Sequence, residues 1–269
     1  MKNLKFAFLL SLLGSFTLSS CLKDNSDWTF EQDNSVSSEL FQDIYKQVDI
    51  TAQSDGSLKS CGTVTLSNSL GNFPNTATID FGNGCMGTDG RMRSGQIIAL
   101  FTGRWRDAGS VITITTNNYK VNKYSVSGTQ TITNNGLNAN NNLTYTVVTA
   151  NGQVRDTTNN QSTQWNATKT FEWVAGQSTN WTNNGPSGIT DDVYHVTGSA
   201  SGVNRNGTPY SAVITERLVR DLSCRWITDG TVEITPQNGD TRTLDFGNGA
   251  CDANVRFTFR RWTFNFLLP

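Results

Sequence analysis

Polar and apolar residues alternate over Gly62-Thr63-Val64-Thr65-Leu66 and again over Thr78-Ile79-Asp80-Phe81-Gly82-Asn83-Gly84-Cys85. Successive side chains of a strand point to opposite faces, so a period of two predicts half-buried strands. The Asn83-Gly84 pair near the end of the second run predicts a tight turn, because both residues accept a positive φ. This stretch therefore indicates antiparallel β structure, and the same alternation recurs along the chain after residue 58.

Asn-Gly pairs recur at short intervals between the alternating segments, at 83–84, 135–136, 151–152, 206–207, 238–239 and 248–249. We expect hairpin turns at these pairs. Sustained helical periodicity is absent from the sequence after residue 58, which excludes parallel β/α units. The predicted fold class is all-β, an antiparallel sheet array that forms either a sandwich or a large curved sheet.

The chain contains an internal repeat of this stretch. Its second copy reads Gly230-Thr231-Val232-Glu233-Ile234, then Thr243-Leu244-Asp245-Phe246-Gly247-Asn248-Gly249-Ala250-Cys251. The repeat predicts related hairpins at 61–105 and 224–262. Two copies so far apart do not make a solenoid, so we expect pseudo-symmetric halves that pair or stack.

One short helix is predicted before the strands, over residues 36–48. Its apolar residues follow the i, i+4, i+8 spacing of one helix face, and they are Leu40, Phe41, Ile44, Tyr45 and Val48. The polar residues 21–35 are predicted to form a tether, and residues 36–269 a single β-rich domain.

The N-terminus has the layout of a signal peptide over residues 1–20. Lys2 and Lys5 precede an apolar run that is too short to span a bilayer. The segment Leu18-Ser19-Ser20-Cys21 resembles a bacterial lipobox. The resemblance implies that Cys21 is the first mature residue and carries acyl chains, such as palmitate, that anchor the protein in the outer membrane. Both the periplasmic and the cell-surface face are compatible with the residues after Cys21.

A wider resemblance covers most of the mature chain. The sequence is similar to a group of uncharacterised Bacteroidota lipoproteins, and the resemblance implies an envelope location but no activity. The motifs that carry it are the lipobox, a helix near residue 40, the DFGNGC segment at 80–85, Asp89-Gly90-Arg91-Met92-Arg93-Ser94-Gly95, Tyr119, Ser127-Gly128-Thr129, and DFGNG at 245–249 with Cys251-Asp252.

Four cysteines remain besides Cys21, and an even number in an exported chain favours disulfides. Cys61 precedes the first strand of its hairpin and Cys85 follows the second, so antiparallel pairing predicts a Cys61–Cys85 bond. The repeat predicts Cys224–Cys251 likewise, although Cys224 aligns less well. A four-cysteine zinc site is the alternative, but zinc ligands usually come in closely spaced pairs, which are absent here.

Several side chains are weaker candidates for binding. Oxygen ligands in glycine-bearing loops suit calcium, and the alternative for the same residues is a turn in which Asp caps the backbone. These residues are Asp80, Asn83 and Asp89, and Asp245, Asn248 and Asp252. Exposed aromatic rings could stack on sugars, although most Trp residues of β domains lie in the core. The candidates for such a platform are Trp165, Trp173 and Trp181, in the segment 161–184.

Catalytic signals are weak throughout the sequence. His195 is the one histidine, and it stands in an alternating strand context without a nearby nucleophile-elbow motif. The net charge is −1 and Lys and Arg do not cluster, which disfavours a nucleic-acid partner. We expect a non-enzymatic, lipid-anchored envelope protein without a cofactor that acts as a scaffold, adhesin or assembly subunit. A glycan-binding surface lipoprotein is the alternative, and a hydrolase ranks third.

Overall fold

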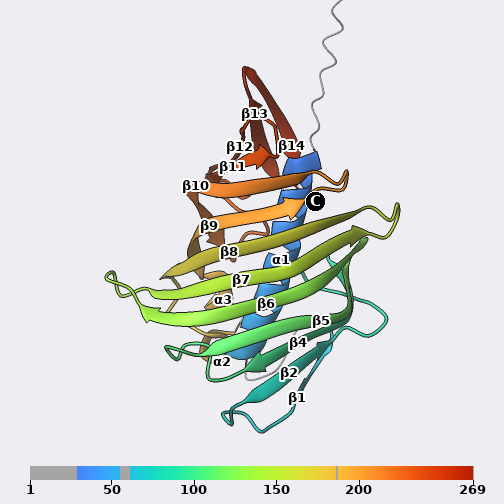
Figure 1. The fold of residues 1–269 in the computed structure, drawn as a ribbon. Coiled ribbons are helices and arrows are strands. Elements are labelled where there is room, and N and C mark those ends of the chain that lie inside the picture. The colour runs from blue at the N-terminus through green and yellow to red at the C-terminus, as the bar shows by residue number, and fades with distance from the viewer. Residues whose placement is uncertain (1–28, 55–60, 186, 269) are drawn as a thin grey trace, which may run out of the picture.

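A long antiparallel sheet makes up most of the protein (Figure 1). The computed structural model describes residues 29–54, 61–185 and 187–268. Its elements in chain order are α1 (Thr29–Gln53), β1 (Thr63–Leu66), β2 (Asn75–Asp80), β3 (Cys85–Met86), β4 (Met92–Phe101), β5 (Val111–Val121), β6 (Tyr124–Leu137), β7 (Leu143–Asp156), β8 (Ser162–Ala175), α2 (Trp181–Asn184), α3 (Ser187–Thr190), β9 (Val193–Val203), β10 (Pro209–Asp221), β11 (Asp229–Pro236), β12 (Arg242–Asn248), β13 (Asn254–Phe259) and β14 (Trp262–Leu267).

The strands follow one another across the sheet almost in sequence order. The order is β1-β2-β4-β5-β6-β7-β8-β9-β10-β11-β12-β13-β14, and the short β3 pairs with β4. All of these pairs are antiparallel. The described strands β1 and β14 end this path without meeting, so the sheet is open. The all-β prediction is confirmed, and of its two alternatives the structure has the large curved sheet.

Helix α1 lies against the sheet and is enclosed by it (Figure 1). It contains 25 residues, and most of them are buried, including many polar and charged ones. The prediction of a helix is confirmed, but the range 36–48 is too short at both ends. Residues 29–35 are helical, so the predicted tether is wrong there, and its remainder, 21–28, lies outside the described residues. The four-residue helices α2 and α3 were not expected.

The first turns of α1 are held by polar contacts with distant strands. Arg242 on β12 pairs with Glu31 at 3.1 Å, and the indole Nε1 of Trp165 on β8 donates to Asn34 Oδ1 at 3.0 Å. Residues 29–35 lack the apolar spacing of an amphipathic helix, so tertiary contacts rather than local pattern extend α1 to Thr29. No described helix is both long enough and apolar enough to cross a membrane.

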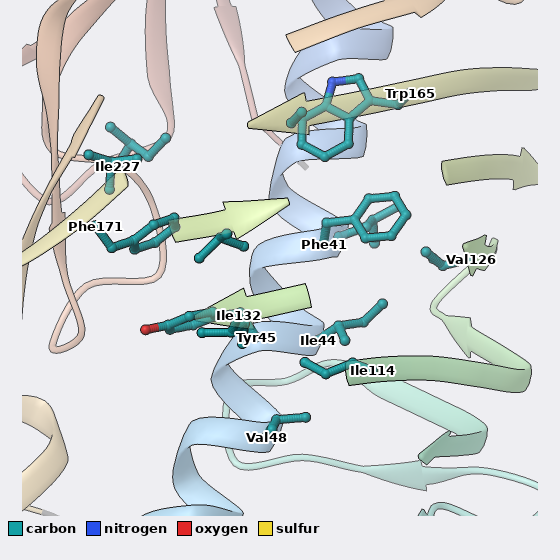
Figure 2. Close-up of a cluster of buried hydrophobic side chains, with 14 of the residues drawn as sticks. Phe41, Ile44, Tyr45, Val48, Ile114, Val126, Ile132, Trp165, Phe171 and Ile227 are labelled. Atoms are coloured by element: carbon teal, nitrogen blue, oxygen red, sulfur yellow. The ribbon is translucent and has the colours of Figure 1, made fainter. Parts of the chain in front are cut away.

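The hydrophobic core lies between α1 and the concave side of the sheet (Figure 2). Phe41 stacks on Trp165 with ring centroids 5.3 Å apart, and Tyr45 stacks on Phe171 at 5.0 Å. Ile44 and Val48 of α1 lie in the same cluster of buried side chains. Offset-stacked aromatic pairs add about 1 kcal/mol each to the burial of apolar area, so the predicted apolar face of α1 anchors it in the sheet.

The two repeated hairpins have the same local structure. In β1–β2 Val64 lies opposite Ile79, and in β11–β12 Val232 lies opposite Leu244. The hairpins lie towards opposite ends of the sheet and are not paired with each other in the strand order. The expectation that the repeated halves pair or stack is therefore wrong, because the strands from β4 to β10 lie between them in the same sheet.

Both predicted disulfides are present. Cys61–Cys85 and Cys224–Cys251 each have a Cα–Cα separation of 5.7 Å, which is within the usual range for a disulfide. The first links the segment before β1 to β3, and the second links the segments that precede β11 and β13. The hairpin argument therefore gave the correct pairing in both repeats.

The Asn-Gly pairs divide into turns and bulges. Those at 206–207 and 238–239 connect β9 to β10 and β11 to β12, as expected. Those at 135–136 and 151–152 lie inside β6 and β7, where the pairing register shifts. Asn151 adopts a φ of 52°, and a β-carbon on Gly152 would lie 2.3 Å from the Trp165 carbonyl oxygen. The hairpin expectation is wrong at these two pairs, because a bulge uses the same positive φ as a turn.

Candidate functional site

The proposed cation ligands of the first repeat have other partners. Asp80 Oδ1 accepts a hydrogen bond from the Gly82 backbone at 2.7 Å, and its Oδ2 accepts one from Gln96 at 2.8 Å. Asn83 is exposed in the turn. Asp89 forms an ion pair with Arg93 at 2.6 Å. These contacts are the ones that the turn alternative predicts, and the cation site stays a prediction from the sequence.

The second repeat behaves in the same way. Asp245 accepts from the Gly247 backbone at 2.9 Å and pairs with Arg256 at 2.8 Å. Asp252 accepts from the Asn254 backbone at 2.8 Å, and Asn248 is exposed at the end of β12. The described part of the chain contains no group of three or more His, Cys, Asp or Glu residues placed to hold a metal.

The arginines of the Asp89–Gly95 motif hold α1 in place. Arg93 Nε donates to Asp43 Oδ2 at 3.0 Å, and Arg91 Nη1 donates to Asp43 Oδ1 at 3.1 Å. Tyr119 donates to the same carboxylate at 2.9 Å, and Arg91 also pairs with Glu39. Burial would raise the pKa of Asp43, but the hydrogen bond and charge of Arg93 outweigh it and leave that pKa lowered. This motif is thus a structural clamp between β4 and α1.

The tryptophans proposed as a sugar platform lie in the core. Trp165 is 2% exposed and Trp173 is 0% exposed, so neither can stack on an external sugar, and that expectation is wrong for both. Burial under α1 explains it, because each ring faces the concave side of the sheet. The backbone of Trp181 begins α2, and its side chain lies outside the described part of the structure.

A cleft of about 650 Å³ opens at the C-terminal end of α1. We call it the distal cleft. It lies between the last turn of α1, the β1–β2 hairpin, the β4–β5 connection and the segment that enters α2. Its apolar side chains come mainly from the hairpin, from β4 and from the connection after β4, and they are Ala52, Leu66, Leu70, Phe73, Ala77, Phe101 and Trp105. Leu70 and Phe73 are 58% and 37% exposed. This volume is typical of small-molecule sites.

The polar lining of the distal cleft is rich in amides. Asn180 and Asn183 come from the segment that leads through α2. Asn75 of β2 also lines the cleft, but it is buried and its amide is bonded to Asn68. Arg104 and Asp107 lie in the β4–β5 connection, where the Arg104 backbone donates to Asp107 at 3.3 Å. Amide groups both donate and accept hydrogen bonds, so this lining suits a ligand that carries many hydroxyl groups.

Arg106 forms the floor of the distal cleft and is held from several sides. Its guanidinium carbon lies 4.4 Å from the centroid of the Trp173 ring. It donates to the Thr179 carbonyl at 2.7 Å, to the Gln177 carbonyl, and to Gln53 Oε1 at 3.2 Å. Cation–π contact and three acceptors leave this side chain little freedom. It therefore connects α1 rigidly to the segment between β8 and α2.

Two buried acids lie behind this floor. Asp49 accepts from Gln53 at 2.7 Å, and Asp192 accepts from Trp173 Nε1 at 3.1 Å. Burial raises the pKa of Asp192 to about 8, and the charge of Asp49 contributes to the rise. Burial also raises the pKa of Asp49 to about 6, against the hydrogen bond of Gln53 and the charge of Arg106. Neither carboxylate is among the described residues that line the cleft.

A smaller cleft, of about 320 Å³, lies at the N-terminal end of α1. Two ion pairs occupy it. Arg205 Nε donates to Asp33 Oδ1 at 2.7 Å, and Lys123 pairs with Asp156 at 2.8 Å. Its charged groups are therefore already paired with one another.

One segment that the sequence singled out overlaps the distal cleft. The segment 161–184 was proposed for sugar binding because of its tryptophans, and Asn180 and Asn183 of the cleft lie in it. The remaining lining comes from the end of α1, the β1–β2 hairpin and the β4–β5 connection. These segments are distant in sequence and share no motif, so only the fold brings them together.

Comparisons with known protein families, with curated proteins and with solved structures found no match to this chain. The resemblance to Bacteroidota lipoproteins therefore stays a prediction from the sequence.

Proposed function

We propose that this chain is a non-enzymatic lipoprotein of a bacterial outer membrane, anchored through Cys21, that binds a glycan in the distal cleft. The observation that carries the proposal is the cleft itself. It combines exposed apolar side chains, Leu70 and Phe73, with amide side chains and the exposed Arg104. Aromatic faces pack on the apolar faces of sugar rings, while amide and guanidinium groups bond to their hydroxyls.

The position of the distal cleft fits an anchored binding protein. The 25 residues of α1 separate it from the anchored end of the chain by about 37 Å, at 1.5 Å per residue. Lipid attachment at Cys21 would hold the opposite end of α1 towards the membrane. The cleft would then open at the far end of the molecule, where soluble ligands have access.

The lining argues against a glycoside hydrolase. Such enzymes use two carboxylates, about 5–10 Å apart, on either side of the scissile bond. Among the described residues that line the distal cleft, Asp107 is the one carboxylate. Asp49 and Asp192 are fully buried, and their carboxylates accept hydrogen bonds from Gln53 and Trp173 inside the protein. We therefore place glycan binding ahead of hydrolysis, and a scaffold or adhesion role without a ligand is the second candidate.

A glycan array followed by calorimetry tests the proposal. The protein is the mature chain, residues 21–269, with Cys21→Ser. We expect binding to one class of glycan, and weakening of about tenfold or more when a central contact is removed by Leu70→Ala, Phe73→Ala or Asn183→Ala.

Matched controls come from other exposed positions. Leu137 is 62% exposed on β6, so Leu137→Ala removes a similar apolar side chain outside the cleft. Arg104→Ala is a fourth cleft variant that should weaken binding, and Arg155→Ala is its control, because both arginines are exposed. Equal affinity in the cleft variants and the controls would disprove the site, and the absence of any bound glycan would favour the scaffold role.

A further inference from the structure

The β13–β14 hairpin presents an aromatic face at the end of the sheet. Phe257 lies opposite Phe264, and Phe259 opposite Trp262. The base of this face is in the core, since Phe257 is 2% exposed. Towards the tip the rings emerge into solvent, with Phe264 at 38% and Trp262 at 51% exposure. Part of the aromatic surface of the hairpin is therefore exposed to solvent.

The tip of the hairpin is positively charged. Arg260 and Arg261 form the two-residue turn, and residues 254–268 contain three arginines and no acid. Arg260 adopts a φ of 52°, in the left-handed region that favours Gly or Asn in such turns. Its ion pair with Asp240 lies in solvent and is therefore weak. Turn geometry alone would not select two arginines here.

The hairpin lies beside the start of α1 (Figure 1). The guanidinium of Arg242 lies over two rings, 5.2 Å from that of Phe30 and 4.9 Å from that of Phe259. Phe30 is the second residue of α1, and Phe259 ends β13. Residues 22–28 separate Cys21 from α1, and seven residues reach at most about 25 Å. A lipid on Cys21 would thus keep the hairpin within about that distance of the bilayer.

We propose that the tip of the β13–β14 hairpin rests on the lipid surface to which Cys21 is attached. Trp262 and Phe264 enter the boundary between headgroups and acyl chains, and Arg260 and Arg261 contact lipid phosphates. Trp prefers this boundary because its ring is apolar and its N–H is polar. Arginine keeps its guanidinium at the headgroups while its stem lies among apolar groups, and anionic lipids attract it.

A lipid surface explains this hairpin better than another protein strand does. Strand β14 ends the sheet path and pairs only with β13 among the described strands, and an exposed apolar edge can recruit a second chain. However, the exposed rings are concentrated with cationic side chains at the tip, beside the start of α1. The inference rests on the proposed lipid anchor, and it adds a second contact that would orient the distal cleft away from the membrane.

Brominated lipids that quench tryptophan fluorescence test the contact directly. The mature chain is coupled through the Cys21 thiol to maleimide lipid in phosphatidylglycerol vesicles, so cellular lipidation is not required. All proteins carry Trp28→Phe, because Trp28 lies close to Cys21 in the sequence. We expect quenching by brominated lipid in this parent, most of which disappears in Trp262→Phe. Equal quenching in both proteins would overturn the proposal.

Partitioning of the untethered protein, with Cys21→Ser, provides the second readout. We expect Trp262→Ser with Phe264→Ser to lower partitioning into phosphatidylglycerol vesicles by about tenfold or more per ring removed. Arg260→Ala with Arg261→Ala should lower it by about fivefold per charge. Leu100→Ser with Leu137→Ser, which changes exposed residues elsewhere, should leave it within about twofold.

Sedimentation velocity distinguishes a lipid contact from a contact with a second copy of this protein. If the wild type forms a dimer that Trp262→Ser with Phe264→Ser dissolves, and vesicle partitioning is unchanged in that variant, the hairpin is a protein interface and the proposal is wrong. Failure of the proposed anchor is a separate result, since it would appear as an unmodified Cys21 in cells while the quenching of the coupled protein persists.

Discussion

Arg93 and Asp43 meet in the interior of the protein, with Arg93 Nε 3.0 Å from Asp43 Oδ2, although they are 50 residues apart in the sequence. Both side chains are almost completely buried. The pair joins β4 to the middle of α1, and Arg91 and Tyr119 converge on the same carboxylate. It therefore sets the position of α1 along the sheet as well as its distance from the sheet.

Asp43→Ala should destabilise the protein by about 3–5 kcal/mol, because it leaves two buried guanidinium groups without their shared acceptor. Urea unfolding measures the change. Asp240→Ala is the matched control, because it removes the acid of the exposed pair with Arg260 and should cost less than about 1 kcal/mol. A similar loss in both variants would show that burial does not govern the contribution of these pairs.

Stability should fall as the pH rises from about 4 to about 8 because of Asp192. Its pKa is about 8 in the folded protein and about 3.9 in an unfolded chain. Between these values the folded state holds a proton that the unfolded state has released, so raising the pH favours unfolding. Asp192→Asn mimics the protonated acid and should be more stable than wild type at pH 8, by on the order of 5 kcal/mol if the full difference between these pKa values is realised.

Chemical denaturation of both proteins between pH 5 and pH 8.5 checks this expectation. The amide introduced by Asp192→Asn retains an oxygen to accept the hydrogen bond of Trp173 Nε1, so the wild-type packing is preserved. A decline in stability that is equally steep in Asp192→Asn would assign the pH dependence to another group.

Each disulfide should contribute a similar amount of stability. The bonds span 24 and 27 residues, and the chain-entropy relation gives about 3.5 kcal/mol for loops of this size. Cys61→Ser with Cys85→Ser should also expose the short edge strand β1 to proteolysis earlier than Cys224→Ser with Cys251→Ser does. Non-reducing peptide mapping establishes the pairing, and a peptide that joins Cys61 to Cys224 would contradict it.

Local patterns in the sequence predicted the strands, the repeat and the disulfides. Strand periodicity and hairpin pairing depend on neighbours in the chain, so Cys61 and Cys85 could be placed beside each other before the fold was known. The same local reasoning failed at Asn135-Gly136 and Asn151-Gly152. A positive φ is needed in a bulge as well as in a turn, and the pair alone does not distinguish them.

Long-range contacts account for what the sequence did not reveal. The start of α1 depends on Glu31 and Asn34 meeting residues from β12 and β8, which are far away in the sequence. The distal cleft is assembled from four separate segments. Trp165 and Trp173 could be placed in the core or on the surface only once the curvature of the sheet around α1 was known.

The mass of the mature N-terminal peptide tests the central claim, that Cys21 anchors this protein in a membrane. We predict a mature chain that begins at Cys21 and carries acyl chains on the sulfur and the amino group of that residue. The protein should fractionate with the outer membrane, and Cys21→Ser should lose both the lipid and this location. A mature chain that begins elsewhere, or an unmodified Cys21 with the same fractionation in Cys21→Ser, would contradict the account.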